Sequence, residues 1–267
     1  MTTSALTPAP RRHAYVLRYS AWQFRDYAIN IGILSVILFG LLGMLEVMQL
    51  RMATRTLELN PRLVSQLGRM RQESFQHLFT MYASVGPILA LSGMVSQDRS
   101  MGYVRFLFAK PLNPLRFYLQ SFVVRTIGYF VVAALLVACY RAFEPTADLG
   151  RVAAGLGLFF IAFGGMTFLG SVISKYDGLG TVAFLLISVV VWAQWEISTT
   201  IWHALTYLVP PIEKFSGVSD WVSNLNPLNP GQPVVFPTKW VIWTVSYGVA
   251  CLVLGVVLLR KRPLARA

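Results

Sequence analysis

Long apolar runs with few charges constrain this chain more than any other feature of its sequence. A helix needs about 20 apolar residues to cross the roughly 30 Å hydrocarbon core of a bilayer, where it satisfies its backbone polar groups without water. Runs approaching or reaching that length predict spans at Tyr27–Met48, His77–Val95, Phe117–Tyr140, Val152–Ile173, Leu179–Trp195 and Trp240–Leu259. The predicted fold is therefore an all-α membrane protein with six transmembrane helices.

The composition agrees with this fold class. Hydrophobic residues make up 55% of the chain and charged residues only 13%, whereas soluble domains carry about 25% charged residues. The net charge of +12 comes from basic residues that flank the predicted spans, where anionic lipid headgroups are the natural partner. We therefore predict contact with membrane lipid and no binding of nucleic acid.

Cys139 and Cys251 fall inside predicted spans and are interpreted as packing residues rather than as a disulfide or a metal site.

The distribution of Lys and Arg predicts the orientation of the spans. Residues 1–26 and 260–267 form basic tails, and basic residues near span ends mark the cytoplasmic side. Both termini are thus expected in the cytoplasm. Residues 27–259 form the predicted transmembrane domain, in the plasma or inner membrane of the cell. A chain with both ends on the same side must cross the membrane an even number of times. The apolar stretch Ile197–Pro211 is too short for another crossing. It begins a predicted outside segment, residues 197–239, that is partly re-entrant.

The first predicted outside loop does not follow this charge rule. It holds five arginines between residues 51 and 71, more than a short outside loop is expected to carry. Apolar residues recur at helical spacing from Leu63 to Leu78, which favours a solvated extension of the second span. The alternative is that the arginines bind an anionic substrate or lipid outside.

A charged stretch between the second and third predicted spans has the pattern of a short amphipathic helix. Residues 97–110 place Asp98 near the start and Lys110 at the end, as the helix dipole favours, and Pro111 then stops the helix. An Asn-Pro pair ending at Pro114 predicts the start of the third span. We expect this short helix to lie at the inner membrane surface.

The same stretch carries a resemblance to a known family. Ser96-Gln97-Asp98-Arg99, then Gly102, the apolar run Val104–Phe108 and Lys110-Pro111 resemble the cytoplasmic segment of ABC type-2 transporter permeases. The chain departs from the usual pattern at Ser100, Met101 and Tyr103. The resemblance implies six spans, an N-terminal interfacial helix, a cytoplasmic coupling helix after the second span and a membrane-dipping segment before the sixth.

In that family the coupling helix docks into a groove of a separate ATPase subunit, which binds ATP and Mg²⁺. The resemblance thus assigns the contact with the ATPase to Asp98, Arg99, Gly102, Tyr103, Arg105, Phe106, Leu107, Phe108, Lys110 and Pro111. No phosphate-binding G-x-x-x-x-G-K-[ST] loop surrounds any lysine of this chain, so we expect no cofactor and no ATP hydrolysis by the chain alone. The simpler alternative is that the stretch only anchors its loop to lipid headgroups.

The N-terminal tail fits the same plan. Arg11, Arg18 and Arg25 recur every seventh residue, with Tyr15 and Trp22 alongside them. On a helix this spacing forms one basic stripe with aromatic residues at headgroup level. The pattern predicts the interfacial helix of the permease plan, and a plain basic anchor before the first span would give a similar pattern.

We expect a transport subunit that pairs with a second copy or a related chain and exports an amphiphilic or hydrophobic substrate. The residues that could line an apolar substrate path are Phe159, Phe160, Phe163, Met166 and Trp192, and packing is an equal alternative for them. Other function classes are a polytopic membrane enzyme and an ATP-independent channel or transporter. Three histidines and few intramembrane acids supply neither a catalytic constellation nor a metal site.

Overall fold

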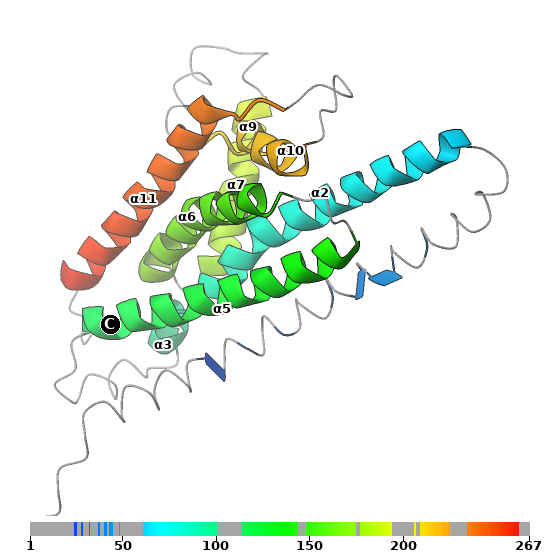
Figure 1. Ribbon diagram of the computed structural model, residues 1–267. Helices are drawn as coiled ribbons and strands as arrows, with labels where there is room; N and C mark the ends of the chain where they lie inside the picture. Colours follow the sequence, from blue (N-terminus) through cyan, green and yellow to red (C-terminus); the bar gives the residue numbers. More distant parts are fainter. Residues whose placement is uncertain are drawn as a thin grey trace, which may run out of the picture.

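The computed structural model of the chain describes residues 61–100, 114–143, 148–174, 177–193, 206, 209–224 and 234–261, with scattered residues between Phe24 and Met48. Over these ranges the chain is built of helices and short turns, without strands (Figure 1). The helices are α2 (Pro61–Leu91), α3 (Ser96–Ser100), α5 (Pro114–Phe143), α6 (Leu149–Ile173), α7 (Asp177–Ala193), α9 (Ile212–Phe215), α10 (Gly217–Ser223) and α11 (Thr238–Lys261).

Among the residues that the structure describes, four stretches are long and apolar enough to cross a membrane, in agreement with the prediction of a helical membrane protein. They are Phe75–Asp98, Leu115–Ala138, Leu149–Ile173 and Thr238–Lys261, and they coincide with the second, third, fourth and sixth predicted spans. The fifth predicted span corresponds to α7, whose apolar part, Leu179–Trp192, is shorter. The first predicted span lies almost wholly outside the described residues, so the total of six spans stays a prediction.

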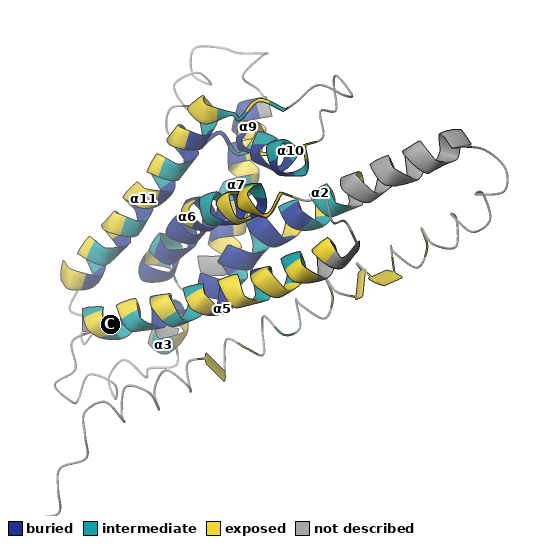
Figure 2. Cartoon of the chain, in the orientation of Figure 1, coloured by how far each residue is buried: buried dark blue, intermediate teal, exposed yellow. Residues whose placement is uncertain are grey.

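Helix α6 forms the centre of the bundle. In its most apolar stretch 67% of the residues are buried, against 22% in α5 and 28% in α11, and Figure 2 shows the same contrast. Small residues allow this packing, because a Cβ on Gly165 would overlap the carbonyl oxygen of Gly248 in α11. A Cβ on Gly248 would lie 2.7 Å from the Cα of Ala162. The two backbones therefore touch where glycines remove the side chains between them.

The outer faces of α5, α7 and α11 are apolar and exposed. This pattern is opposite to that of a soluble bundle, in which polar residues cover the outside. It suits helices that face acyl chains or another membrane helix. The most exposed apolar side chains on these faces are Val123, Ile127, Val131 and Leu135 on α5, Leu179, Leu186, Ile187 and Val190 on α7, and Ile242, Val249, Val253 and Leu254 on α11.

The predicted extension of the second span and the predicted start of the third are both confirmed. Helix α2 begins at Pro61, well before the candidate span that starts at Phe75. Its first turns therefore extend about 20 Å beyond that span at 1.5 Å per residue, and they project past the other described helices in Figure 1. Helix α5 begins at Pro114, where the Asn-Pro signal predicts the third span.

Candidate functional site

The chain leaves α2 through a tight turn before the short helix α3. Gly93 in this turn has φ +74°, a left-handed conformation that glycine adopts without the steric cost of a Cβ. The last four carbonyls of a helix have no partner within the helix and need other donors. Here Ser92 N donates to Ile88 O (2.8 Å), Ser92 Oγ to Leu89 O (3.3 Å), Arg125 Nη1 to Ala90 O (3.0 Å) and Met94 N to Leu91 O (3.4 Å).

Among these donors, Arg125 comes from another helix, 35 positions from its acceptor Ala90. It lies in α5, inside the candidate span Leu115–Ala138, and its Nη1 also donates to Ser92 O at 2.9 Å. An arginine within a membrane span is costly unless its charge finds polar partners. Arg125 meets that need by binding the end of a neighbouring helix, and α2 thereby gains donors for carbonyls that its own backbone leaves without one.

Asp98 in α3 faces the same corner of the bundle. Its carboxylate lies within electrostatic range of Tyr118 and Arg125. Tyr118 is fully buried on α5, and Asp98 itself is half-buried, whereas the preceding residue, Gln97, is exposed. We call the group Ala90, Ser92, Asp98, Tyr118 and Arg125 the inner junction, after the side of the membrane that the predicted topology gives it.

Helix α6 holds the turn from another side. The Val95 amide donates to Ser171 Oγ at 3.2 Å, and Leu91, Val95 and Ser96 are buried. The turn is thus fixed by side chains of both α5 and α6.

The inner junction contains the start of the predicted contact with the ATPase. Asp98 and Arg99 lie in α3, and the separation of α3 from α2 agrees with the predicted helix start near Ser96. The remaining predicted contact residues lie outside the described residues: Gly102, Tyr103, Arg105, Phe106, Leu107, Phe108, Lys110 and Pro111.

The predicted substrate-path residues of α6 lie in the packed core. Phe159 and Phe163 stack on each other with ring centroids 5.6 Å apart, and Phe215 of α9 packs against them at 4.8 and 6.2 Å. Phe160 contacts Tyr129 of α5 at 5.0 Å. Met166 is buried on the same helix. These contacts give the side chains a packing role in this conformation, and their role in a substrate path stays a prediction.

Trp192 lies on α7 and has different neighbours. Its indole N–H donates to Val209 O at 3.2 Å, and its ring meets Trp240 and Trp243 of α11 edge to face. Ser188, one turn earlier, donates to Pro210 O at 3.0 Å. The predicted path residues are therefore held in separate contacts, with Trp192 helping to bind the segment before α9 to α7 and α11.

Helices α9 and α10 belong to the predicted re-entrant segment and pack against α2, α6 and α7. Phe215, Val218 and Val222 are buried. A Cβ on Gly155 of α6 would lie 2.6 Å from Val222 Cγ2 and 2.9 Å from Phe79 of α2, so the absence of a side chain at Gly155 permits the three helices to meet. Helices α9 and α10 are thus an integral part of the core.

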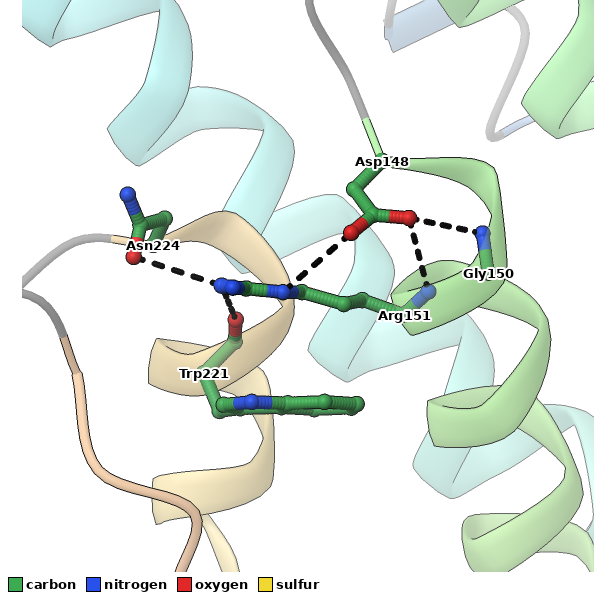
Figure 3. A network of polar contacts seen from close by, with 5 residues as sticks. All are labelled: Asp148, Gly150, Arg151, Trp221 and Asn224. Carbon is green, nitrogen blue, oxygen red and sulfur yellow. Dashed lines mark hydrogen bonds and ion pairs between the residues drawn. The ribbon is translucent and has the colours of Figure 1, made fainter.

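A polar network joins the start of α6 to the end of α10 (Figure 3). Asp148 caps α6 by accepting from the amides of Gly150 and Arg151 at 2.9 and 3.3 Å, and it pairs with Arg151 Nε at 3.3 Å. Arg151 Nη1 donates to Trp221 O and Asn224 Oδ1, both at 3.3 Å, and its guanidinium lies 5.4 Å from the Trp221 ring centroid. We call these residues the outer network, after the side of the membrane that the predicted topology gives them.

A second polar contact holds α10 against α2. Gln76 Nε2 donates to Asp220 Oδ1. Burial raises the pKa of the Asp220 carboxyl above its ordinary value of 3.8, and the hydrogen bond from Gln76 opposes that rise. Since the two residues are 144 positions apart, no local pattern in the sequence indicates the pair.

The sequence indicates only some of the residues that form the inner junction and the outer network. Asp148 directly before an apolar run is a recognisable helix-cap signal, and Arg125 stands out as a charge inside an apolar run. Ser171 and Arg151 give no signal of their own, because their partners, Val95 and Trp221, come from distant segments.

Comparisons of the chain with protein-family models, with curated proteins and with solved structures find no match. Within the described part of the chain, no group of three or more His, Cys, Asp or Glu side chains is arranged to hold a metal ion.

Proposed function

We propose that this chain is the membrane-spanning permease subunit of an ATP-driven transporter of the ABC type-2 kind. In this proposal it pairs with a second permease chain in the cell membrane, both termini face the cytoplasm, and a separate ATPase subunit binds ATP and Mg²⁺. The support comes from the residue pattern at Ser96–Pro111 together with the apolar helices.

The observation that carries the proposal is the attachment of the turn before α3, where the predicted coupling segment (residues 97–110) begins, to two other helices. Coupling requires that a displacement of the segment by the ATPase reach the spans, so its base must be stiff. The turn before α3 is bound by Arg125 of α5 and Ser171 of α6, and its apolar side chains are buried. A loop that merely rests on lipid headgroups has no need of such attachment to two spans.

The proposed cargo is amphiphilic or hydrophobic and moves outward. The core around α6 is lined by aromatic and aliphatic side chains, with Phe159, Phe163 and Phe215 in mutual contact. Alternating access would separate some of these contacts, and the surfaces so opened suit an apolar substrate. In this reading Phe215 of α9 covers the end of the path that is expected to face outside.

The test is reconstitution of the permease with its ATPase in lipid vesicles. We expect lipidic or hydrophobic compounds to stimulate ATP hydrolysis and to move away from the nucleotide-bearing side. Leu107→Asp or Phe108→Asp should uncouple hydrolysis from transport, because a charge would enter the apolar groove of the ATPase. Leu107→Met, which keeps an apolar side chain of similar volume, is the matched control. Coupled transport that survives both aspartate substitutions would refute the coupling assignment.

A further inference from the structure

Helix α2 contains a weak point inside its candidate membrane span, Phe75–Asp98. Pro87 lies within the helix and has no amide N–H, so the carbonyl of Ala83, four residues earlier, loses its helical donor. The residue before it is Gly86, and glycine is second only to proline in disfavouring a helix. Kinks in long helices concentrate at such positions. A displacement of the turn at the end of α2 would therefore be absorbed by bending at Pro87 unless the two parts of the helix are held together.

Helix α5 contacts α2 on the first side of this weak point. The Tyr82 hydroxyl donates to Tyr129 O at 2.8 Å, and the two rings stack with centroids 5.1 Å apart and an angle of 8° between their planes. Gly86 allows this approach, because a Cβ there would lie 2.7 Å from Cε2 of Tyr129. Both tyrosines are buried, so this hydrogen bond forms where water does not compete for it.

Helix α5 also contacts the chain beyond Pro87. Arg125 donates from Nη1 to Ala90 O at 3.0 Å and to Ser92 O at 2.9 Å. Residues four apart lie on the same face of a helix, so Arg125 and Tyr129 belong to one face of α5. That face therefore holds α2 both before and after the proline. The planar guanidinium fixes the direction of its hydrogen bonds as well as their length.

We infer that α5 is a splint across Pro87, and that Tyr82 and Arg125 are positioning residues that hold the two parts of α2 in one arrangement. The splint prevents a displacement of the turn before α3 from being lost in a bend at the proline, so α2 and α5 move as one unit. Its role in coupling rests on the proposed function, whereas the splint itself is a property of the isolated chain. The two can therefore be tested separately.

The first experiment measures bending at Pro87 in the purified chain alone. Spin labels are placed on both sides of the proline, at the exposed positions Met81 and Gln97, after both native cysteines are replaced by alanine. We expect a narrow distribution of distances between the labels, and a wider one with Arg125→Gln. Adding Pro87→Ala should narrow the distribution again, because the new amide can donate to Ala83 O.

Tyr82→Phe is the milder variant in this experiment. It removes one hydroxyl and keeps the ring that stacks on Tyr129, so the chain should fold even if Arg125→Gln does not. It should also widen the distribution, and Pro87→Ala should again reverse the change. The splint is overturned if neither substitution widens the distribution, or if Pro87→Ala leaves the widened distribution as it is.

The second experiment adds the ATPase subunit and measures the amount transported per ATP hydrolysed. Arg125→Gln should lower this ratio about tenfold and Tyr82→Phe about fivefold, the effects of one charged and one neutral hydrogen bond. The ATPase should still copurify, since both contacts lie within the permease. Pro87→Ala should restore much of the ratio in each background, because an unbroken helix no longer needs the splint. A loss of coupling that Pro87→Ala does not restore would overturn the role of the splint in transport.

Two substitutions serve as matched controls in both experiments. Arg116→Gln removes an exposed charge of α5. Tyr247→Phe removes a hydroxyl of α11 and keeps the ring that stacks on Phe184. Neither should widen the distance distribution or lower the transport ratio, and control effects as large as those of Arg125→Gln would contradict the splint.

The two experiments distinguish the splint from the proposed function. A wild-type chain that binds no ATPase would refute the proposed function, even if the label distances respond as expected. Label distances that do not respond, in a chain that does bind the ATPase and couple to it, would refute the splint alone.

Discussion

In both the inner junction and the outer network an arginine binds backbone carbonyls near the end of a helix, but the first region is buried and the second is exposed. Arg125 binds carbonyls at the end of α2, and Arg151 binds the Trp221 carbonyl near the end of α10. At the inner junction Ala90 and Tyr118 are fully buried, whereas at the outer network the Asp148 side chain is 59% exposed. The comparison teaches that the contribution of such an arginine to stability depends on whether water can replace it as the donor to the carbonyls.

The physical reason lies in the state that follows loss of the arginine. A buried carbonyl without a donor costs about 1–3 kcal/mol, whereas an exposed carbonyl can bind water at little cost. Exposed ion pairs such as Arg151 with Asp148 contribute about 0–1 kcal/mol. The inner junction should therefore be sensitive to substitution and the outer network tolerant.

Helix α6 supports both regions, so breaking its packing has the largest expected effect. Gly165→Ala would place a Cβ against the backbone of Gly248, and neither backbone can give way as a flexible side chain could. We expect the free energy of unfolding to fall by about 3 kcal/mol, measured by denaturation in detergent micelles. Hydrogen exchange should increase both in the turn at residues 92–95 and in α10.

Gly157→Ala is the matched control on the same helix, because no atom lies within 4 Å of a Cβ at that position. It should leave stability unchanged or raise it by up to about 1 kcal/mol, since alanine is the better helix former. Equal losses from the two substitutions would contradict the close contact of α6 with α11.

The second prediction separates the two arginines. Arg125→Met should lower the free energy of unfolding by about 2 kcal/mol, because it removes the donor that binds the carbonyls of Ala90 and Ser92. Arg151→Met should cost about 1 kcal/mol or less, since its ion pair and its contact with Trp221 are partly solvated. Denaturation of the two variants beside wild type measures the difference, and similar losses would remove the distinction between the regions.

The smallest expected effect is the pH dependence of thermal stability that arises from Asp220 in α10. Since burial raises the pKa of Asp220 above 3.8 in the folded chain, the folded state holds this proton more tightly than the unfolded chain does. The resulting stabilisation is fully present below the ordinary pKa and is lost as the pH rises through the raised folded-state value. The melting temperature of wild type should therefore fall relative to that of Asp220→Asn over this window.

Gln76→Leu sharpens the same measurement. It removes the hydrogen bond that favours the charged carboxylate, so the pKa of Asp220 should rise further and the loss of stability with pH should become larger. Parallel melting curves for wild type and Asp220→Asn across the window would show that the burial of Asp220 has no consequence for stability.

Much of the helix pattern could be predicted from the sequence, because the requirement to satisfy backbone polar groups in lipid acts along each segment separately. The start of α5 at Pro114 agrees with the local Asn-Pro signal, and the course of α2 before Phe75 agrees with the helical spacing from Leu63 to Leu78. The expected apolar path at Phe159 and Phe163 was a weaker inference, since the same residue types line cores and substrate paths. The structure packs both rings against Phe215 of α9, a contact that no local pattern predicts.

The sequence by itself determined that this chain forms apolar helices, where several of them begin, and that a short helix separated by a break follows the second predicted span. Only the tertiary structure decided which groups complete the ends of those helices. Arg125 meets Ala90 across 35 positions, and Gln76 meets Asp220 across 144. Apolar periodicity records which face of a helix is buried, but a hydrogen bond between distant segments depends on how the helices pack, which the glycines of α6 and α11 govern through contacts between backbones.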